Sequence, residues 1–416
     1  MGQIDSYILL IGIGAIIVLS YLYDLLSLKL KVPSVLFLIS TGIALQYIDT
    51  RFLQNIHLAD TLLPTLEILG MLGMIMIVLE AALDLEITKN KIPLIRNSFF
   101  MALIVLIISS LAIALIIMNV GAPTPFFNSL IYAIPLSVVS SAVLIPSVHN
   151  LTQNKKEYMT YEATFSDIIG IMFFNFIVIQ GGLFFSIDGL LMIIMTIGFS
   201  LFFSVVLVMG ATKLRANLKL FLVIALLCIL YAVGKKMHLS PLLMIFIFGL
   251  ILNNGHKMTK KINYNQRFIE NSSLKKLKHD FKIITGESSF LMRTCFFVIF
   301  GMSINLRAIL EIEVIVVGSI IVILLYLIRF INFKLFIKTD VFPEVFLAPR
   351  GLITILLFYQ IPAYYQIESF SVEILSFVII VTGLVMSLAL IFTPSIKAEE
   401  LTVIDIGLAP VSEDFD

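Results

Sequence analysis

Long apolar runs alternate with short polar segments along almost the whole chain, up to about residue 393. A run of about 20 mainly apolar residues is long enough to cross a bilayer as a helix. This pattern predicts an all-α polytopic membrane protein with about thirteen transmembrane helices, near residues 4–23, 33–48, 61–83, 97–119, 127–148, 158–183, 187–210, 217–233, 239–253, 284–304, 313–331, 343–362 and 370–393. We expect one transmembrane domain over residues 1–396 and a short cytoplasmic tail over residues 397–416.

Two of these predicted helices contain internal prolines. The fifth contains Pro135 and Pro146, and the twelfth contains Pro349. Proline lacks a backbone N–H and breaks a helix, and irregular backbone at membrane depth is tolerated only where it is buried or lines a cavity. Broken helices in corresponding places of two halves indicate a transporter built from inverted repeats. We therefore expect two crossed discontinuous helices, within inverted repeats of about residues 1–183 and 217–393.

Composition supports the membrane assignment and narrows the chemistry. The chain is 60% hydrophobic and 13% charged, with a mean hydropathy of +1.07, whereas soluble domains carry about 25% charged residues. A net charge of +1 gives no indication of a nucleic-acid partner. Cys228 and Cys295 both lie in apolar runs, and none of the five histidines forms a pair with metal-ligand spacing. We expect no disulfide framework, no cofactor and no metal beyond a transported ion.

The basic residues of the polar segments predict an orientation. If the N-terminus is outside, the outside loops hold only Arg51, Lys235, Lys236 and Arg307, and all other loop lysines and arginines are inside. Because Lys and Arg are enriched in cytoplasmic loops, we expect a protein of the cell membrane with its N-terminus outside and its C-terminus in the cytoplasm. The longest predicted loop, residues 254–282, is basic, and is either a solvated linker or a contact for anionic lipids.

Asp167 is the most informative single residue, because it lies inside the predicted span 158–183. An ionised carboxylate within a bilayer is costly, so it normally faces a water-filled cavity and handles ions or protons. Glu162 on the same span and Arg329 on the span 313–331 fall at similar membrane depth, because the two spans run in opposite directions. We expect Glu162 and Arg329 to neutralise each other, which leaves Asp167 for a cation or a proton. The alternative is that all three residues only pair within a polar core.

The two proline breaks place further polar groups inside the membrane. Ser140 and Ser141 lie between the prolines of the fifth predicted helix, where freed carbonyls and hydroxyls are candidates to coordinate a cation. Serine in membrane helices also serves packing and local hydrogen bonding, so this signal is weak by itself. Arg350, between Pro349 and a glycine, puts a cation at the second break, where it has a gating or helix-breaking role.

Two other charges lie in or beside apolar runs. Glu80 is either part of a funnel that gives cations access to the site or a charge that reaches the interface from within the helix. Arg293 is either a structural residue or a cationic gate.

Several motifs resemble those of one known family in order and spacing. They are KVPSVLFLISTGI (31–43), VLEAALDLE (78–86), YEATFSD (161–167), FFVIFGMSI (296–304), LIRF (327–330) and PRGL (349–352). Together they resemble the cation:proton antiporter superfamily, especially its sodium/proton exchanger (NhaP-like) branch. There are departures: Ser166 replaces the family's asparagine or second aspartate, and Ala163 replaces its serine. Ser140 and Ser141 stand where exchangers often have threonine–aspartate, which is more like the potassium-efflux branch.

The resemblance implies a function and a set of roles. Asp167 would carry a proton and a cation in turn, with Ser166, Ser140 and Ser141 helping to bind the cation, and Glu162 and Arg329 would hold the site together. With one central acid, we expect electroneutral exchange of one Na⁺ for one proton by a homodimer in the bilayer, with no enzymatic activity.

Three alternatives are weighed against Na⁺/H⁺ exchange. Exchange of K⁺ (or Li⁺) for protons stays open, because a carboxylate with few extra oxygens does not separate these ions by ligand type. A passive cation channel is disfavoured, because selectivity filters use rings of carbonyls or charges, commonly from oligomers. An intramembrane hydrolase is disfavoured as well, since the chain has no HExxH motif and no serine–histidine pair at similar depth.

Overall fold

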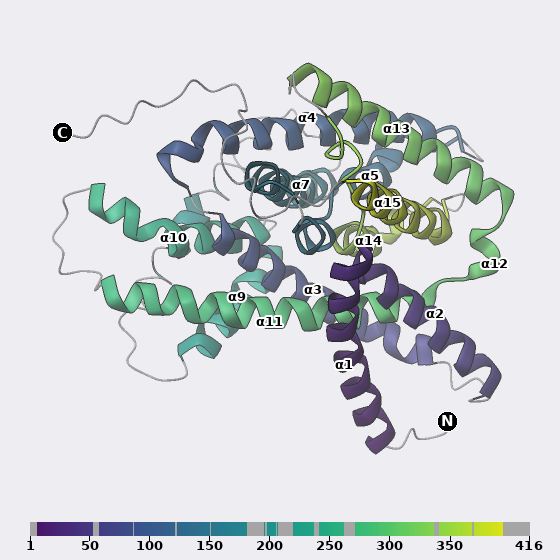
Figure 1. Ribbon diagram of the computed structural model, residues 1–416, viewed down its shortest axis with the longest axis horizontal. Helices are drawn as coiled ribbons and strands as arrows, with labels where there is room; N and C mark the ends of the chain where they lie inside the picture. Colours follow the sequence, from purple (N-terminus) through teal and green to yellow (C-terminus); the bar gives the residue numbers. More distant parts are fainter. Residues whose placement is uncertain are drawn as a thin grey trace.

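In the computed structural model of the protein, all regular elements of the described residues are helices (Figure 1). These are residues 6–52, 58–85, 87–120, 123–149, 151–180, 195, 198–204, 206, 219–236, 241–261, 271–336, 341–367 and 370–393. In this part of the chain, six helices are long and apolar enough to cross a membrane, and Ser34–Ile48 and Pro241–Asn254 are shorter apolar helices. The all-α membrane prediction is confirmed, and the number thirteen stays a prediction.

One group of helices, which we call the scaffold helices, packs around α11 and α3. They are α1 (Ser6–Leu30), α2 (Ser34–Phe52), α3 (Leu58–Asp84), α9 (Lys219–Lys236), α10 (Pro241–Lys261) and α11 (Asn271–Ser303). α11 packs along both α2 and α3, and α10 packs on α3 and α9. A side chain at Gly42 of α2 would collide with the backbone of α11 at Val298 and Gly301. These two glycines therefore allow the helix backbones to touch, as small residues commonly do in membrane bundles.

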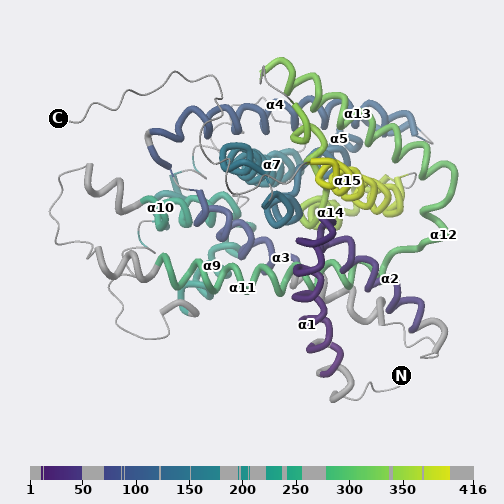
Figure 2. The backbone as a smooth tube through the Cα atoms, viewed as in Figure 1, coloured from purple at the N-terminus to yellow at the C-terminus, as the bar shows by residue number. Residues whose placement is uncertain are grey.

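A second group, which we call the site helices, comes from both halves of the chain. They are α4 (Ile92–Ile117), α5 (Phe126–Ser137), α6 (Ser141–Leu144), α7 (Gln153–Gln180), α13 (Ile312–Phe336), α14 (Leu352–Tyr359) and α15 (Val372–Phe392). α4 packs on α5, α7 and α13, and α13 packs on α15. In Figure 2 the yellow C-terminal helix α15 is seen near the green helix α13, on which it packs. Each half contributes one broken element between two long helices.

The two broken elements cross at their extended segments. In the first, α5 ends at Ser137, residues 138–140 are extended, and α6 is followed by the short helix η2 (Ile145–Ser147). In the second, residues 347–351 are non-helical and α14 begins at Leu352. The residue before a proline avoids the helical region, which explains why the backbone before Pro349 is not helical. The amide of Ser140 donates to the carbonyl of Pro349 at 2.9 Å. The expectation of crossed discontinuous helices is therefore confirmed.

The structure corrects two boundaries. The predicted span 343–362 is helical mainly at its C-terminal side, because turns occupy residues 342–346 and the extended segment follows. The prediction of a loop over residues 254–282 is wrong, since α10 continues to Lys261 and α11 begins at Asn271, with residues 262–270 outside the described part. Average hydropathy hid this helix, because its first turns are rich in lysine, although Phe281 of α11 is fully buried.

Three shorter helices complete the described elements. They are η1 (Lys89–Lys91), α12 (Leu306–Ile309) and η3 (Ala363–Tyr365). Most of the predicted span 187–210 and the whole predicted tail 397–416 lie outside the described residues.

Candidate functional site

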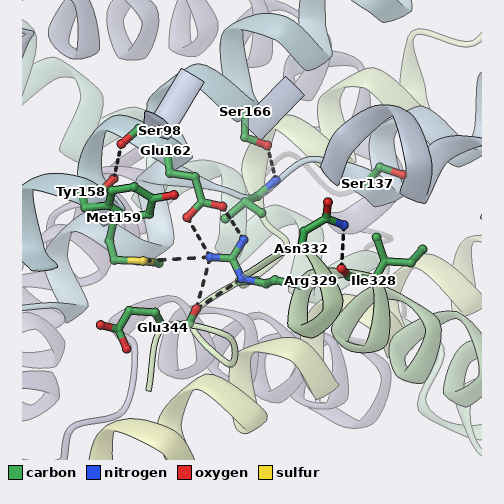
Figure 3. A network of polar contacts seen from close by, with 12 residues as sticks. Ser98, Ser137, Tyr158, Met159, Glu162, Ser166, Ile328, Arg329, Asn332 and Glu344 are labelled. Atoms are coloured by element: carbon green, nitrogen blue, oxygen red, sulfur yellow. Dashed lines mark hydrogen bonds and ion pairs between the residues drawn. The ribbon is translucent and has the colours of Figure 1, made fainter. Parts of the chain in front are cut away.

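Glu162 of α7 and Arg329 of α13 form a buried, two-pronged ion pair (Figure 3). Arg329 donates from Nη1 to Oε1 of Glu162 at 2.5 Å and from Nη2 to Oε2 at 2.8 Å. Each residue is only 1% exposed. The guanidinium also donates to the carbonyl of Glu344 and lies over the ring of Phe333 at 4.7 Å from its centroid. Bidentate geometry and these extra contacts are what a buried charge pair needs to offset its desolvation cost.

Glu344 extends this pair into a network that the sequence reasoning missed. Its carboxylate accepts from Lys155 of α7 at 2.6 Å, while its carbonyl accepts from Arg329. Glu344 lies in the turn that leads into the second break, so the network fastens this turn to α7 and α13. An acidic residue just before the apolar, proline-containing stretch was the available signal.

Asp167 lies farther along α7 and contacts the first break. The amide and the hydroxyl of Ser141 both donate to its Oδ2, at 3.0 and 2.5 Å. The carboxylate is 4% exposed, and its other oxygen, Oδ1, has no hydrogen-bond partner among the described residues. Next to it, the hydroxyl of Ser166 accepts from the amide of Val139 at 2.9 Å. Two neighbouring side chains of α7 therefore hold the extended segment between α5 and α6.

Arg350 binds the other end of the same break. Its guanidinium donates to the carbonyls of Leu136 at 2.8 Å, Ser137 at 3.4 Å and Ala348 at 2.6 Å. A cation at a helix C-terminus offsets the negative end of the helix dipole, which explains an arginine at the end of α5. It also means that the carbonyls of Leu136 and Ser137, freed by the break, already have a donor in this conformation.

Several of the buried oxygen atoms without a described partner lie on the broken elements and α7. They include Asp167 Oδ1, Ser140 Oγ on the first break and Thr354 Oγ1 on α14. The two breaks meet at Ser140, because a Cβ added to Gly351 would lie 2.7 Å from the Ser140 hydroxyl. Carboxylate and hydroxyl oxygens suit hard cations such as alkali ions. Thr354 was missed from the sequence, although it is a hydroxyl in an apolar run directly after the second break.

Glu80 of the scaffold helix α3 and Arg293 of α11 lie near enough to each other to interact electrostatically. Arg293 also reaches the first break, since its Nη1 donates to the carbonyl of Ala142 at 3.0 Å. Among the described residues, no group of three or more His, Cys, Asp or Glu side chains has an arrangement that could hold a metal ion.

Comparisons with known proteins agree with this geometry. The sequence model of the family described as "Sodium/hydrogen exchanger, transmembrane" matches residues 14–395. Two structures of the sodium proton antiporter MjNhaP1 from Methanocaldococcus jannaschii share the fold at 21% identity. One, at pH 8, aligns with a TM-score of 0.67 over 93% of this chain and 99% of that chain. The other, an electron-microscopy map, aligns with a TM-score of 0.64 over 93% and 95%. A comparison with curated protein sequences gave no significant match. The family match spans nearly the whole chain, and the chain therefore belongs to the sodium/hydrogen exchanger family.

Proposed function

We propose that the protein is a secondary active antiporter that exchanges Na⁺ for H⁺ by alternating access, with Asp167 as the carrier. The observation that carries this proposal is the buried carboxylate at the crossing of two broken helices, with one oxygen held by Ser141 and the other without a described partner. Membership of the sodium/hydrogen exchanger family and a fold shared with a sodium proton antiporter support the same reaction.

The chemistry follows from the two oxygens of Asp167. Oδ2 accepts both donors from Ser141, so the carboxylate keeps its orientation while Oδ1 binds either a proton or a cation. Glu162 and Arg329 satisfy each other and do not compete for the ion. Asp167 binds either one proton or one monovalent cation at a time. Each cycle therefore exchanges one cation for one proton without net charge movement.

Ser140 is the hydroxyl that we propose as a direct cation ligand, because its oxygen is buried and has no described partner. Ser141 and Ser166 orient the carboxylate and the break, and each oxygen retains acceptor capacity for a cation. This set of one carboxylate and a few hydroxyls suits Na⁺, K⁺ and Li⁺ by ligand type. K⁺/H⁺ exchange is therefore the second candidate, and the departure of Ser140 and Ser141 from the exchanger pattern favours it.

The decisive experiment compares the wild type with Asp167→Asn in proteoliposomes that contain a pH-sensitive dye. The wild type should dissipate an imposed proton gradient only when Na⁺ or K⁺ is added, with saturation, whereas a channel would conduct without obligatory proton coupling. Asp167→Asn should fold but lose cation-dependent proton flux, because the amide cannot exchange a proton for a cation.

A matched control is Asp84→Asn, which alters an acid at the end of α3 that pairs with Lys282. This variant should retain exchange. Cation-dependent proton flux in Asp167→Asn would show that the carrier is another residue.

We also propose how the chain is organised in the membrane. Residues 1–396 would form the antiporter domain, with inverted repeats of about 1–183 and 217–393 and a cytoplasmic tail over 397–416. The occurrence of a broken element between two long helices in each half supports the repeats. A homodimer in the cell membrane, with its N-terminus outside, is the expected assembly. Native mass spectrometry and labelling of cysteines introduced near each terminus would test these points.

A further inference from the structure

The first break is anchored to the scaffold helices as well as to the site helices. Arg293 extends from α11, and its Nη1 donates to the carbonyl of Ala142 at 3.0 Å. Ala142 directly follows Ser141, whose amide and hydroxyl hold the carboxylate of Asp167. The hydrogen bond from Arg293 of α11 therefore ends at Ala142, the residue after Ser141, which orients the proposed carrier Asp167.

The covalent structure explains why this carbonyl needs an outside donor. In a continuous helix, the carbonyl of Ala142 would accept from the amide of the residue four positions later. That residue is Pro146, which has no backbone N–H. An unpaired carbonyl buried in a membrane protein costs free energy, so a donor from another helix stabilises the break. Arg293 supplies that donor.

A carboxylate of the scaffold helices lies near Arg293. Glu80 of α3 interacts with it electrostatically, and the Nε of Arg293 donates to the carbonyl of Ser289 on its own helix at 3.3 Å. The Glu80 carboxylate faces α11 about two turns before Arg293, since a Cβ added to Gly286 would lie 3.8 Å from its Oε1. Arg293 is thus held from the scaffold side while one of its nitrogens binds the break.

We propose that Arg293 is a positioning residue that fixes the first break against the scaffold helices in this conformation. We also propose that it releases the Ala142 carbonyl when the site helices move relative to the scaffold helices. The second statement rests on the proposed alternating-access function. The first concerns only the structure, and it can be tested without transport.

Hydrogen–deuterium exchange of the purified protein in nanodiscs tests the first statement. The amides of Val139, Ser140 and Ser141 each donate to a site acceptor, so a peptide spanning residues 138–147 reports on the break. Arg293→Met removes the donor at similar length and should speed exchange of this peptide about tenfold, as expected for the loss of a charge-assisted hydrogen bond. Arg293→Lys keeps one ammonium donor and should stay within about threefold of the wild type.

The matched control is Thr294→Val on the next residue of α11. It removes a buried hydrogen bond of 2.7 Å to Ser20, which joins two scaffold helices and does not reach the break. Exchange in the 138–147 peptide should therefore change by less than about twofold. If Arg293→Met leaves Glu80 uncompensated and unfolds, the double variant Glu80→Gln/Arg293→Met removes both charges and should show the same faster exchange. Unchanged exchange at the break in the folded variants overturns the positioning role.

Initial rates of cation-driven proton flux in proteoliposomes test the release. Because the contact must break in each cycle, Arg293→Met should change the maximal rate by at least about threefold. Arg293→Lys should restore the rate toward the wild type, and Thr294→Val should leave it unaltered. If Arg293→Met speeds hydrogen–deuterium exchange at the break but leaves the maximal transport rate unchanged, the proposed release of the Ala142 carbonyl is wrong. The positioning role would still stand. Absence of cation-dependent flux in the wild type would instead overturn the proposed function.

Discussion

At the scale of single residues, the site depends on which oxygen atoms have donors and which do not. Asp167 Oδ2 receives two donors from Ser141, while Asp167 Oδ1 and Ser140 Oγ have none among the described residues. Buried polar atoms normally find a partner, so buried oxygens without one are informative where an ion is expected to bind. Arg350, in contrast, supplies donors: it hydrogen-bonds the carbonyls of Leu136 and Ser137 at the end of α5.

Ser140→Ala should raise the half-saturating cation concentration several-fold while the maximal rate stays within about twofold, because it removes one proposed neutral ligand and retains the proposed carrier, Asp167. Proteoliposome flux at varied Na⁺ and K⁺ measures both quantities. Ser137→Ala is the control, since that buried hydroxyl donates to the carbonyl of Ala133 in its own helix. An unchanged half-saturating concentration in Ser140→Ala would mean that this hydroxyl does not touch the ion.

At the scale of elements, charged side chains hold together helices that are far apart in the sequence. The Glu162–Arg329 pair joins α7 to α13, and Glu344 links the turn before the second break to both of them. Asp167 and Ser166 join α7 to the first break. These contacts keep the two broken elements crossed beside α7, so the proposed ion site lies at the junction of elements from both halves of the chain.

Glu162→Gln and Arg329→Ala should each destabilise the protein more than Asp167→Asn does. Removing one partner of a buried pair leaves an uncompensated charge, at a cost of about 3–5 kcal/mol. Asparagine at position 167 can still accept from Ser141 through its side-chain oxygen. Thermal unfolding in detergent compares the three variants, with Glu162→Leu/Arg329→Met expected to recover part of the loss. Equal melting temperatures for the three single variants would show that the pair contributes little to stability.

At the scale of the whole molecule, the two helix groups differ in the kind of contact that holds them together. The scaffold helices touch closely through small residues such as Gly42 and Gly301, whereas the site helices carry the buried charges. Arg293 and Lys31 bridge the groups: Lys31, in the turn between α1 and α2, donates to the carbonyl of Thr393 after α15 at 2.9 Å. Relative motion of the groups would have to break such contacts, and this is the molecular form of alternating access that we propose.

Transport should be electroneutral and should slow as the pH falls. Protons and cations compete for the same carboxylate, so below the pKa of Asp167 the apparent cation affinity should weaken about tenfold for each pH unit. Rates and final gradients measured in proteoliposomes, with and without an imposed membrane potential, test both points. A marked dependence on the potential would mean that a second charge moves, and Glu80 and Arg293 would then be the first residues to substitute.

The sequence by itself determined that the chain lies in a membrane and which buried charges are candidates for the site. Long apolar runs have to be helices in a bilayer, because backbone groups there must pair within the segment. A charge inside such a run needs a partner or a function, which is why Asp167, Glu162 and Arg329 could be selected from their positions along the chain alone. The internal prolines located the two breaks for the same kind of local reason, since proline removes a donor wherever it stands.

Only the tertiary structure decided which atoms meet. Nothing local to Pro349 indicates that its carbonyl accepts from Ser140, or that Arg293 replaces the donor that Pro146 lacks. Glu344 was missed because its contacts are with Lys155 and Arg329 on other helices. The polar start of α11 was missed because a helix with one buried face has low average hydropathy. The apolar pattern along the chain determines where helices form, whereas contacts between distant helices determine which charges and hydroxyls form the site.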